Sequence, residues 1–459
     1  MKATAIILAA GEGTRMNSDM PKVAHEVLGV SIIEHVVAAA QAAGVDRVVV
    51  VTGHKADVVE ALLPGLEFAR QNEQHGTGHA VMCALEAVGE ITGPVVILAG
   101  DVPLIRPETI ASLVETAAST KAGCVVLSAR FPDPTGYGRI IRSVSGEVTG
   151  ITEHKDLPAE LLYMDECNVG SYCFDGAALS AHLHRLEASN AQAEYYLTDL
   201  VALFAIEGLG VRAVITDDVD ESHGVNSRVQ LAEVTRVLQR RINERHMLAG
   251  VTMISPESTW IAPGVKLGRD VIIEPMTFLM GEVSVGDRAH LGPNTRITDS
   301  TIGADVRVDS SIVLGAVVGV GASVGPVAYL RPGAVLAARA KAGACVEIKN
   351  STVGESSKVP HLSYIGDATI GSGVNVGAGT ITCNYDGVAK HRTVIEDGVF
   401  IGSDTMLVAP VRIGEGAITG AGSAIARDVP AGALGIERTE QRNVTGFAER
   451  RRKQTKRDE

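Results

Sequence analysis

The chain has 459 residues and a formal net charge of −13, and 46% of its residues are apolar although only 3% are aromatic. This length predicts at least two domains, and the acidic balance argues against a nucleic-acid-binding protein. No apolar run reaches the ~18 residues that a membrane-spanning helix requires, so we expect no membrane partner. The six cysteines show no CxxC pair and no metal-ligand spacing, and the chain starts on a strand-like run without a signal peptide. These features predict idle thiols in a cytoplasmic protein.

Residues 1–226 alternate apolar strand-like runs with apolar helical stretches. Helices are predicted between the strands, for example over 32–44 and 78–88. Buried parallel strands are predicted over 3–10, 45–53, 93–101 and 122–131. This alternation predicts a doubly wound α/β domain, in which ligands bind at the carboxyl ends of the strands.

A glycine-rich segment, residues 8–16, follows the first of these strands directly. Gly11 and Gly13 would let the backbone come close to phosphate groups, so that amide N–H groups can bind them. Arg15 and Lys22 add positive charge where a triphosphate would lie. The spacing matches neither the dinucleotide fingerprint nor the Walker loop, and a glycine pair alone is equally compatible with a simple turn.

A change of period marks the second half of the chain. Residues 227–248 have apolar positions at helical spacing and a charged opposite face, which predicts a linker helix. From 249 to about 435, aliphatic residues recur every six positions, as in Ile261, Leu267, Ile273 and Leu279. Six is the period of a hexapeptide-repeat β-helix, a left-handed parallel coil with triangular turns. The polar, basic residues 436–459 form a C-terminal tail, whose end is predicted to be solvated or disordered.

Charged and polar side chains stand out within the repeat, because a β-helix coil has no need of buried charge. Residues 380–393 also interrupt the six-residue rhythm, which predicts a protruding loop of the kind that often carries function. Taken alone, the cations could be solvated side chains and the histidine could be structural. The set lies in neighbouring coils and comprises Arg331, Lys349, His361, Tyr364, Asn375, Asn384 and Tyr385.

The sequence LAAG-x-G-T-R-M, followed by Pro-Lys, resembles the signature of sugar-1-phosphate nucleotidyltransferases. The resemblance implies that Arg15 and Lys22 act in uridylyl transfer and that Asp101 and Asn226 bind Mg²⁺, which suits two oxygen ligands completed by phosphates and water. It implies a uracil-reading segment at Gln71, and sugar contacts further along the chain. The implied UTP- and sugar-nucleotide-binding set is Leu8, Ala9, Ala10, Gly11, Lys22, Gln71, Gly76, Thr77, Gly138, Glu153, Asn168 and Asn226.

The polar set of the repeat resembles the acetyltransferase half of the bifunctional N-acetylglucosamine-1-phosphate uridyltransferase and glucosamine-1-phosphate acetyltransferase family. The resemblance extends from residue 3 to about residue 438. It implies that His361 is the general base. Binding of glucosamine 1-phosphate is implied for Arg331, Lys349, Tyr364 and Asn375. Contacts with acetyl-CoA are implied for Ala378, Asn384, Tyr385, Ser403, Ala421 and Arg438.

The implied product is UDP-N-acetylglucosamine, a precursor of bacterial peptidoglycan and lipopolysaccharide. The implied partners are UTP, acetyl-CoA, glucosamine 1-phosphate and its N-acetylated form, and two further copies of the chain in a homotrimer. The predicted domains are a uridyltransferase domain (1–226), the linker helix (227–248), the acetyltransferase β-helix (249–435) and the tail (436–459).

Two alternatives stay open beside this interpretation. The first is a single-function sugar nucleotidyltransferase whose β-helix serves only assembly, against which His361, Lys349 and Arg331 argue. The second is a non-catalytic scaffold, and a scaffold has no reason to keep the charged phosphate cradle of Lys22 and Asp101.

Overall fold

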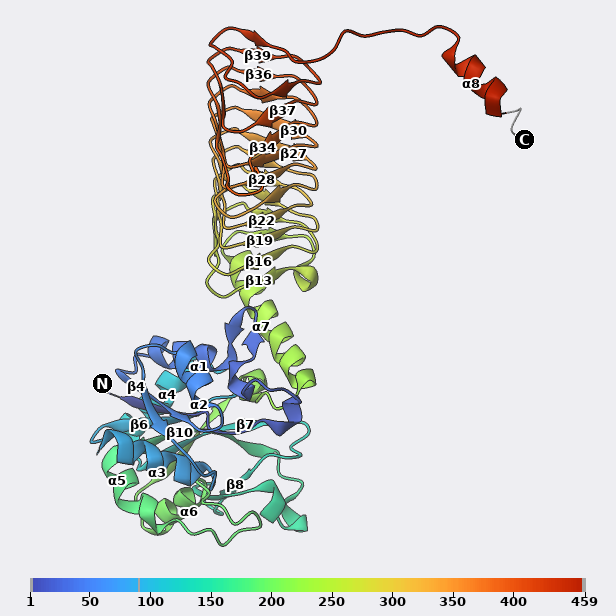
Figure 1. The fold of residues 1–459 in the computed structure, drawn as a ribbon. Helices are drawn as coiled ribbons and strands as arrows, with labels where there is room; N and C mark the ends of the chain where they lie inside the picture. The colour runs from blue at the N-terminus through green and yellow to red at the C-terminus, as the bar shows by residue number, and fades with distance from the viewer. Residues whose placement is uncertain (1–2, 90, 456–459) are drawn as a thin grey trace. The chain divides into compact units, whose positions relative to one another are not determined.

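The computed structural model describes residues 3–89 and 91–455 of the chain, which divides into two compact units. The first unit ends at Ile242 and the second begins at Asn243, so the division falls inside helix α7 (Arg228–Leu248). The domain boundaries drawn from the sequence at 226 and 248 therefore stay predictions. Figure 1 traces the chain through both units.

A mixed β-sheet forms the centre of the first unit. Its strands are β1 (Thr4–Leu8), β4 (Arg47–Thr52), β5 (Glu67–Arg70), β6 (Pro94–Ala99), β7 (Cys124–Arg130), β8 (Arg139–Arg142), β9 (Val148–Thr152), β10 (Glu166–Asp175) and β11 (Val211–Thr216). The order across the sheet is β11-β7-β10-β6-β1-β4-β5, and β8 and β9 join it through β10. A separate short hairpin is formed by β2 (Glu26–Val27) and β3 (Val30–Ser31).

The four predicted strands are confirmed as β1, β4, β6 and β7, and all four run in one direction. The sheet is not parallel throughout, however, because β10 lies between β6 and β7 and is antiparallel to both. The chain reaches β10 from β7 through the β8–β9 hairpin. A parallel return would need a longer crossover, usually a helix, so this connection reverses the strand.

Helices cover both faces of the sheet, which confirms the doubly wound α/β class (Figure 1). They are α1 (Ile32–Ala42), α2 (Ala56–Leu62), α3 (Thr77–Val88), α4 (Pro107–Thr120), α5 (Gly176–His182) and α6 (Asp199–Ile206). Ile7 packs in one core with α1, α2 and α4, whereas its neighbour Ile6 packs in the other with α3, α5 and α6. Successive strand residues point to opposite faces, so an unbroken apolar run serves both cores.

Three parallel sheets form the second unit, as the six-residue period predicts, and a complete coil contributes one short strand to each sheet. The first sheet contains β12 (Thr252–Met253), β15 (Ile272–Ile273), β18 (His290–Leu291), β21 (Arg307–Val308), β24 (Ser323–Val324), β27 (Lys341–Ala344), β30 (Lys358–His361), β33 (Asn375–Val376), β36 (Phe400–Ile401), β39 (Ile418–Thr419) and β41 (Leu434–Gly435). The second contains β13 (Trp260–Ile261), β16 (Phe278–Met280), β19 (Arg296–Thr298), β22 (Ile312–Leu314), β25 (Tyr329–Leu330), β28 (Glu347–Lys349), β31 (Tyr364–Gly366), β34 (Ile381–Cys383), β37 (Met406–Val408) and β40 (Ala424–Ile425). The third contains β14 (Lys266–Leu267), β17 (Ser284–Val285), β20 (Thr301–Ile302), β23 (Val317–Val318), β26 (Val335–Leu336), β29 (Thr352–Val353), β32 (Ala368–Ile370), β35 (Thr393–Ile395) and β38 (Val411–Ile413).

The repeated aliphatic residues fill the interior of this coil. Leu279 and Ile297 pair in register and are fully buried, and Ile348 and Ile365 repeat the arrangement further along. Corners between strands use left-handed backbone, for example at Asp270 with φ of 58°. Short polar residues tolerate this conformation, which explains the turn residues in the repeat. The arrangement is that expected for the predicted β-helix.

Two segments depart from the regular coil. The predicted interruption is confirmed as residues 384–392, a loop between β34 and β35 that is closed by a bridge between Tyr385 and Lys390. Helix α8 (Phe447–Thr455) forms within the tail (Figure 1), and residues 436–454 are exposed, as expected for a solvated segment, whereas residues 456–459 lie outside the described residues. Among the described residues, none of the helices combines the length and the apolar character that crossing a membrane requires.

Candidate active sites

A cleft of about 430 Å³ in the first unit gathers most of the residues predicted to bind the nucleotide and the sugar. It lies where β1 and β6 end, as expected for a doubly wound domain. Three predicted residues, Arg15, Gly138 and Asn226, are outside its lining. The predicted residues that line it are Leu8, Ala9, Ala10, Gly11, Lys22, Gln71, Gly76, Thr77, Asp101, Glu153 and Asn168.

The two glycines of the loop play different parts. Gly11 is exposed in the cleft with no atom within 4 Å of where a Cβ would stand, so its backbone is open to a ligand. Gly13 has φ of 65°, and a Cβ there would lie 2.5 Å from Cβ of Lys22. Gly13 therefore allows the stem of Lys22 to pack against the loop. Arg15 is exposed in a short 3-10 helix, η1 (Thr14–Met16), outside the cleft lining.

Lys22 brings together the two residues predicted to bind the metal. Its ammonium donates to Oδ2 of Asp101 at 2.5 Å and to Oδ1 of Asn226 at 2.9 Å. Asp101 follows β6 and Asn226 precedes α7, and the two loops are joined where Val225 N donates to Asp101 O at 2.8 Å. The two side-chain oxygens thus converge on one cation, so this donor set fits Mg²⁺, a hard cation that takes oxygen ligands. Among the described residues no cluster of three or more His, Cys, Asp or Glu could hold a metal.

Gln71 is the predicted base-reading residue, and its amide is held in one orientation. Its Nε2 donates to Gly76 O at 3.1 Å and lies 3.0 Å from Nδ1 of His79. The amide oxygen is therefore the group that Gln71 can offer to a ligand, and it suits a donor such as the N3–H of uracil. Gly76 has φ of 100°, and a Cβ there would lie 2.7 Å from Tyr195 O, so only glycine fits.

The predicted sugar-binding residues lie together around Glu153. A Cβ on Gly138 would stand 3.3 Å from Oε2 of Glu153, which places the two side by side although Gly138 does not line the cleft. Thr198 donates to Oε1 of Glu153 at 3.2 Å, and Asn168 donates to the hydroxyl of Tyr172 at 2.7 Å. Burial raises the pKa of Glu153 above its usual range, and the Thr198 hydroxyl opposes the rise without cancelling it.

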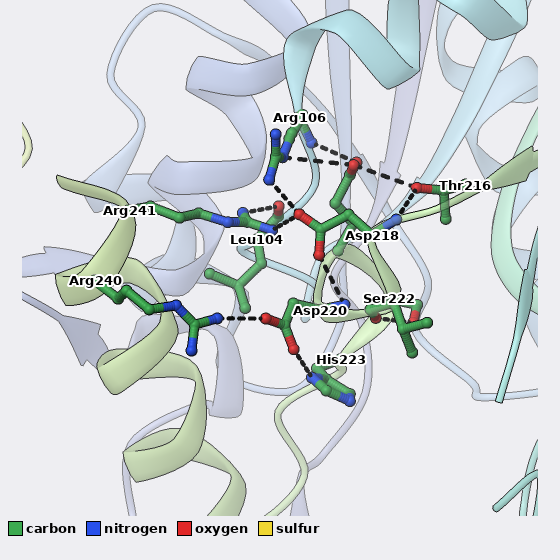
Figure 2. A network of polar contacts seen from close by, with 11 residues as sticks. Leu104, Arg106, Thr216, Asp218, Asp220, Ser222, His223, Arg240 and Arg241 are labelled. Carbon is green, nitrogen blue, oxygen red and sulfur yellow. Dashed lines mark hydrogen bonds and ion pairs between the residues drawn. The ribbon is translucent and has the colours of Figure 1, made fainter. Parts of the chain in front are cut away.

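A polar network supports the two loops that carry Asp101 and Asn226 (Figure 2). The carboxylate of Asp218 accepts hydrogen bonds from Arg106 and, at 2.9 Å, from Arg241 of α7. Arg241 also donates to Leu104 O at 2.7 Å, and the nearly inaccessible Glu221 accepts the Arg106 backbone N–H at 3.0 Å. Burial alone would raise the pKa of Asp218, but the charges of Arg241 and Arg106 outweigh it and hold that pKa below its usual range. The network fastens both loops to α7.

In the second unit, the predicted base and three predicted acetyl-CoA residues form one column along a corner of the coil. The backbone links them rung by rung: Gly379 N donates to His361 O at 3.4 Å, Asp404 N to Ala378 O at 2.7 Å, and Gly422 N to Ser403 O at 2.8 Å. The column then reaches Ala421, whose carbonyl accepts from the Arg438 guanidinium at 2.9 Å. The first residues of the tail thus lie against the last coil. The column consists of His361, Ala378, Ser403 and Ala421.

The predicted phosphate-binding cations form a second column. Lys349 of β28 pairs with Gly366, and Arg331 occupies the equivalent place one coil earlier, where its guanidinium bonds Glu347 at 2.8 Å. The Lys349 ammonium lowers the pKa of Lys390, so two cations from different coils approach one another. The Asp367 carboxylate already faces both ammonium groups, and the net positive charge that remains suits a phosphate group.

Tyr364 and Asn384 lie beside the Lys349 column. A Cβ on Gly366 would stand 2.4 Å from the Tyr364 hydroxyl and 2.8 Å from Nδ2 of Asn384, so this glycine makes room for both. Asn384 donates to Asp367 at 2.5 Å. Asn384, which is predicted to contact acetyl-CoA, thus lies beside Tyr364, which is predicted to bind glucosamine 1-phosphate.

Within one chain, the two columns are not brought together. His361 ends a strand of the first β-helix sheet, just before β31, whereas Lys349 lies opposite the far end of β31. Asn375 starts β33 on the sheet that carries His361, and Tyr385 is exposed in the 384–392 loop. The predicted base and the predicted phosphate-binding cations therefore lie at opposite ends of the second-sheet strands.

Sequence reasoning missed several residues that the structure places at the two sites. Gln74, Tyr172 and Thr198 line the cleft, and Gln74 donates to Ala10 O at 2.7 Å. Lys390 lies in the 384–392 loop, which the interruption of the repeat had indicated. Its positive charge in that loop was the sequence signal by which it could have been identified as a site residue. The cleft residues carried no such signal, because a glutamine, a tyrosine and a threonine are common in any α/β domain.

Comparison with known proteins gives the same two halves. A model of the MobA-like NTP transferase domain matches residues 5–162, and a model of six bacterial transferase hexapeptide repeats matches residues 392–427. A "Bifunctional protein GlmU" of Thermobifida fusca is 50% identical over 458 residues, which cover 98% of this chain and 95% of that protein. Proteins of the same name from Heliobacterium modesticaldum and Syntrophomonas wolfei are 50% and 48% identical, over 98% and 97% of this chain and 99% of each relative. With a nucleotidyltransferase cleft followed by a hexapeptide-repeat coil, the chain belongs to the family of bifunctional GlmU proteins.

Proposed function

We propose that the protein makes UDP-N-acetylglucosamine in two steps, acetylating glucosamine 1-phosphate with acetyl-CoA and then joining the product to UMP from UTP. The observation that carries this proposal is the presence, in one chain, of two separate constellations, one suited to nucleotidyl transfer and one suited to acetyl transfer onto a sugar phosphate. One is the cleft with Lys22, Asp101 and Asn226, and the other is the β-helix corner with His361 and the Lys349 column. Neither a single-function transferase nor a scaffold needs both.

In the first unit the chemistry is in-line displacement. A phosphate oxygen of N-acetylglucosamine 1-phosphate attacks the α-phosphorus of UTP, and the bond to pyrophosphate breaks. The nucleophile needs no general base, because the second phosphate pKa is about 6 and the oxygen is already ionised at neutral pH. The chain contributes positioning, through Gly11 at the phosphates, Gln71 at the base and Glu153 at the sugar.

Charge neutralisation completes the first reaction. Mg²⁺ held by Asp101 and Asn226 would supply positive charge to the phosphates of UTP and of the leaving pyrophosphate. Lys22, which lines the same cleft, adds a mobile positive charge. Arg15 is exposed beside the loop and is the natural cation for the far end of the triphosphate.

In the second unit the amine of glucosamine 1-phosphate attacks the thioester carbonyl of acetyl-CoA. His361 accepts the proton that the amine nitrogen releases, the C–S bond breaks, and coenzyme A leaves as its thiolate. Imidazole is the most frequent general base in enzymes, which suits His361 to this role. Arg331, Lys349 and Lys390 hold the sugar phosphate, and the corner column of Ala378, Ser403 and Ala421 binds coenzyme A.

The separation of the two columns supports an oligomer, and we propose the homotrimer that the family resemblance implies. One copy supplies the base and the acetyl-CoA column, and the facing copy supplies the phosphate-binding cations. Co-expression of a His361→Ala chain with a Lys349→Ala chain tests this arrangement, because mixed trimers then contain some intact sites. Acetyl transfer by the mixed trimers but by neither parent trimer supports it, and an inactive mixture contradicts it.

One coupled assay tests both steps. Purified protein receives glucosamine 1-phosphate, acetyl-CoA, UTP and Mg²⁺, and the products are resolved by mass spectrometry. We expect UDP-N-acetylglucosamine. If only N-acetylglucosamine 1-phosphate appears, the assignment of nucleotide or sugar in the first unit is wrong. If supplied N-acetylglucosamine 1-phosphate is uridylylated but glucosamine 1-phosphate is not acetylated, the assignment of the β-helix is wrong.

A further inference from the structure

The ammonium of Lys22 occupies the place between the two proposed metal ligands. It lies 2.5 Å from Oδ2 of Asp101 and 2.9 Å from Oδ1 of Asn226, and Lys22 begins a short 3-10 helix, η2 (Lys22–Ala24), far from both in sequence. The side chain of Lys22 is only 13% exposed and that of Asp101 21% exposed, so little water screens the pair. The carboxylate is thus neutralised within the chain itself.

A divalent cation bound to the same two oxygens would exclude this ammonium. Mg²⁺ binds oxygen at about 2.0–2.1 Å, and an ammonium kept at its hydrogen-bond distance would then face a double positive charge a few ångströms away. One of the two cations must leave. Only the end of the lysine side chain is free to do so, because Gly13 packs against its Cβ and fixes the stem.

We propose that Lys22 is a tethered cation that holds Asp101 and Asn226 together before substrate binds and that gives up this place to the metal. The displaced ammonium turns into the cleft, which Lys22 lines together with the exposed loop glycine Gly11. There it meets the phosphates of the incoming nucleotide. This inference rests on the proposed function of the first unit, because it assumes that Asp101 and Asn226 bind the metal.

A consequence is that the protein without nucleotide binds the divalent cation weakly, since the cation must compete with Lys22. Nucleotide phosphates relieve the competition by offering the ammonium another anion. Metal and nucleotide binding are then mutually favourable, as linkage requires. A lysine that only contacts phosphate would instead leave metal binding in the nucleotide-free protein unchanged.

The test measures Mn²⁺ binding to the full-length protein without nucleotide, from the electron paramagnetic resonance signal of free Mn²⁺. Mn²⁺ serves as the probe because it takes the same oxygen ligands as Mg²⁺. We expect Lys22→Met to bind Mn²⁺ at least tenfold more tightly than the parent protein. The matched control is Lys121→Met, an exposed lysine at the end of α4 outside the cleft, which should change the affinity less than twofold.

A second measurement follows the lysine itself. Reductive methylation, quantified by mass spectrometry, should label Lys22 of the parent protein more extensively when Mn²⁺ is added, with Lys121 unaffected. Equal or weaker Mn²⁺ binding by Lys22→Met, or Lys22 labelling that ignores Mn²⁺, would overturn the inference. If Lys22→Met gains affinity and the gain survives Asp101→Asn, the cation binds elsewhere, and it is the proposed metal site that fails.

Discussion

Replacing Asp218 with asparagine tests whether the network of Figure 2 stabilises the first unit and its metal-binding loops. Asparagine has the same size but lacks the charge that faces Arg106 and Arg241. The side chains of Asp218, Arg241 and Arg106 are 29%, 20% and 46% exposed, so both ion pairs are partly screened. Pairs at the surface contribute about 0.2–1 kcal/mol and hydrogen bonds to buried charges about 1.5–3 kcal/mol. Because both ion pairs lie between these two cases, we expect Asp218→Asn to lower the free energy of unfolding by about 2 kcal/mol.

The two units offer separate optical signals for this experiment. All of α1 to α6 lie in the first unit, so the far-ultraviolet circular dichroism of helix reports mainly on it. Trp260, the single tryptophan of the chain, lies in β13 and reports on the second unit. With a slope of about 2–3 kcal/mol per M urea, the helical transition of Asp218→Asn should move down by roughly 0.7–1 M. The Trp260 transition and acetyl transfer should not change.

The pH dependence of this difference has a definite sign. The pKa of Asp218 is lowered in the folded protein, so its contribution is present above the unfolded pKa of about 3.9 and is lost as the pH falls through the folded value. The gap between parent and variant should therefore stay constant from pH 5 to 8 and close below about pH 4. A helical midpoint that moves by less than about 0.2 M, or a Trp260 transition that moves equally, would refute the reasoning.

Three further predictions concern the two sites. Asp101→Ala should abolish uridylyl transfer and spare acetylation. His361→Ala should spare uridylyl transfer and slow acetylation about 10²–10⁴-fold, the usual cost of removing a general base. Separate assays of the two half-reactions check both variants, and a folded variant that loses both activities would contradict the two-site assignment. Gly366→Ala should raise the KM for glucosamine 1-phosphate about tenfold or more, because its Cβ would stand 2.4 Å from the Tyr364 hydroxyl. Gly264→Ala is the control in the same β-helix, since its Cβ meets only Glu282 at 3.5 Å, and equal effects of the two would count against the prediction. Glu153→Gln should stabilise the first unit at pH 7 but not below about pH 4, because folding raises the pKa of Glu153 and so disfavours its ionised form in the folded protein. The same variant should bind N-acetylglucosamine 1-phosphate about 10–100-fold more weakly in calorimetry at pH 7. Unchanged affinity would remove Glu153 from the sugar site.

Local patterns in the sequence sufficed for the architecture of both units. A β-helix coil needs an inward aliphatic residue at each face, so a six-residue period appears directly in the chain and predicts residues such as Leu279 and Ile348 as core. A strand followed by a glycine loop is likewise local. The glycine pair alone was equally compatible with a simple turn, and it is the structure that places Gly11 in the lining of the cleft. The direction of β10 was not predictable in this way, because strand direction depends on the connection and not on the composition of the strand.

The composition of the sites depended on contacts between residues that are distant in sequence. Lys22 and Asn226 are 204 positions apart, yet one hydrogen bond joins them. The approach of Lys390 to Lys349 and the place of Asn384 beside Tyr364 likewise arise only when coils stack. The repeat by itself specifies which residues face inward on each coil, because the inward, buried position recurs every six residues along the chain. Which outward side chains meet is decided by the register of the stacked coils and by the insertion at 384–392, and these are properties of the assembled tertiary structure.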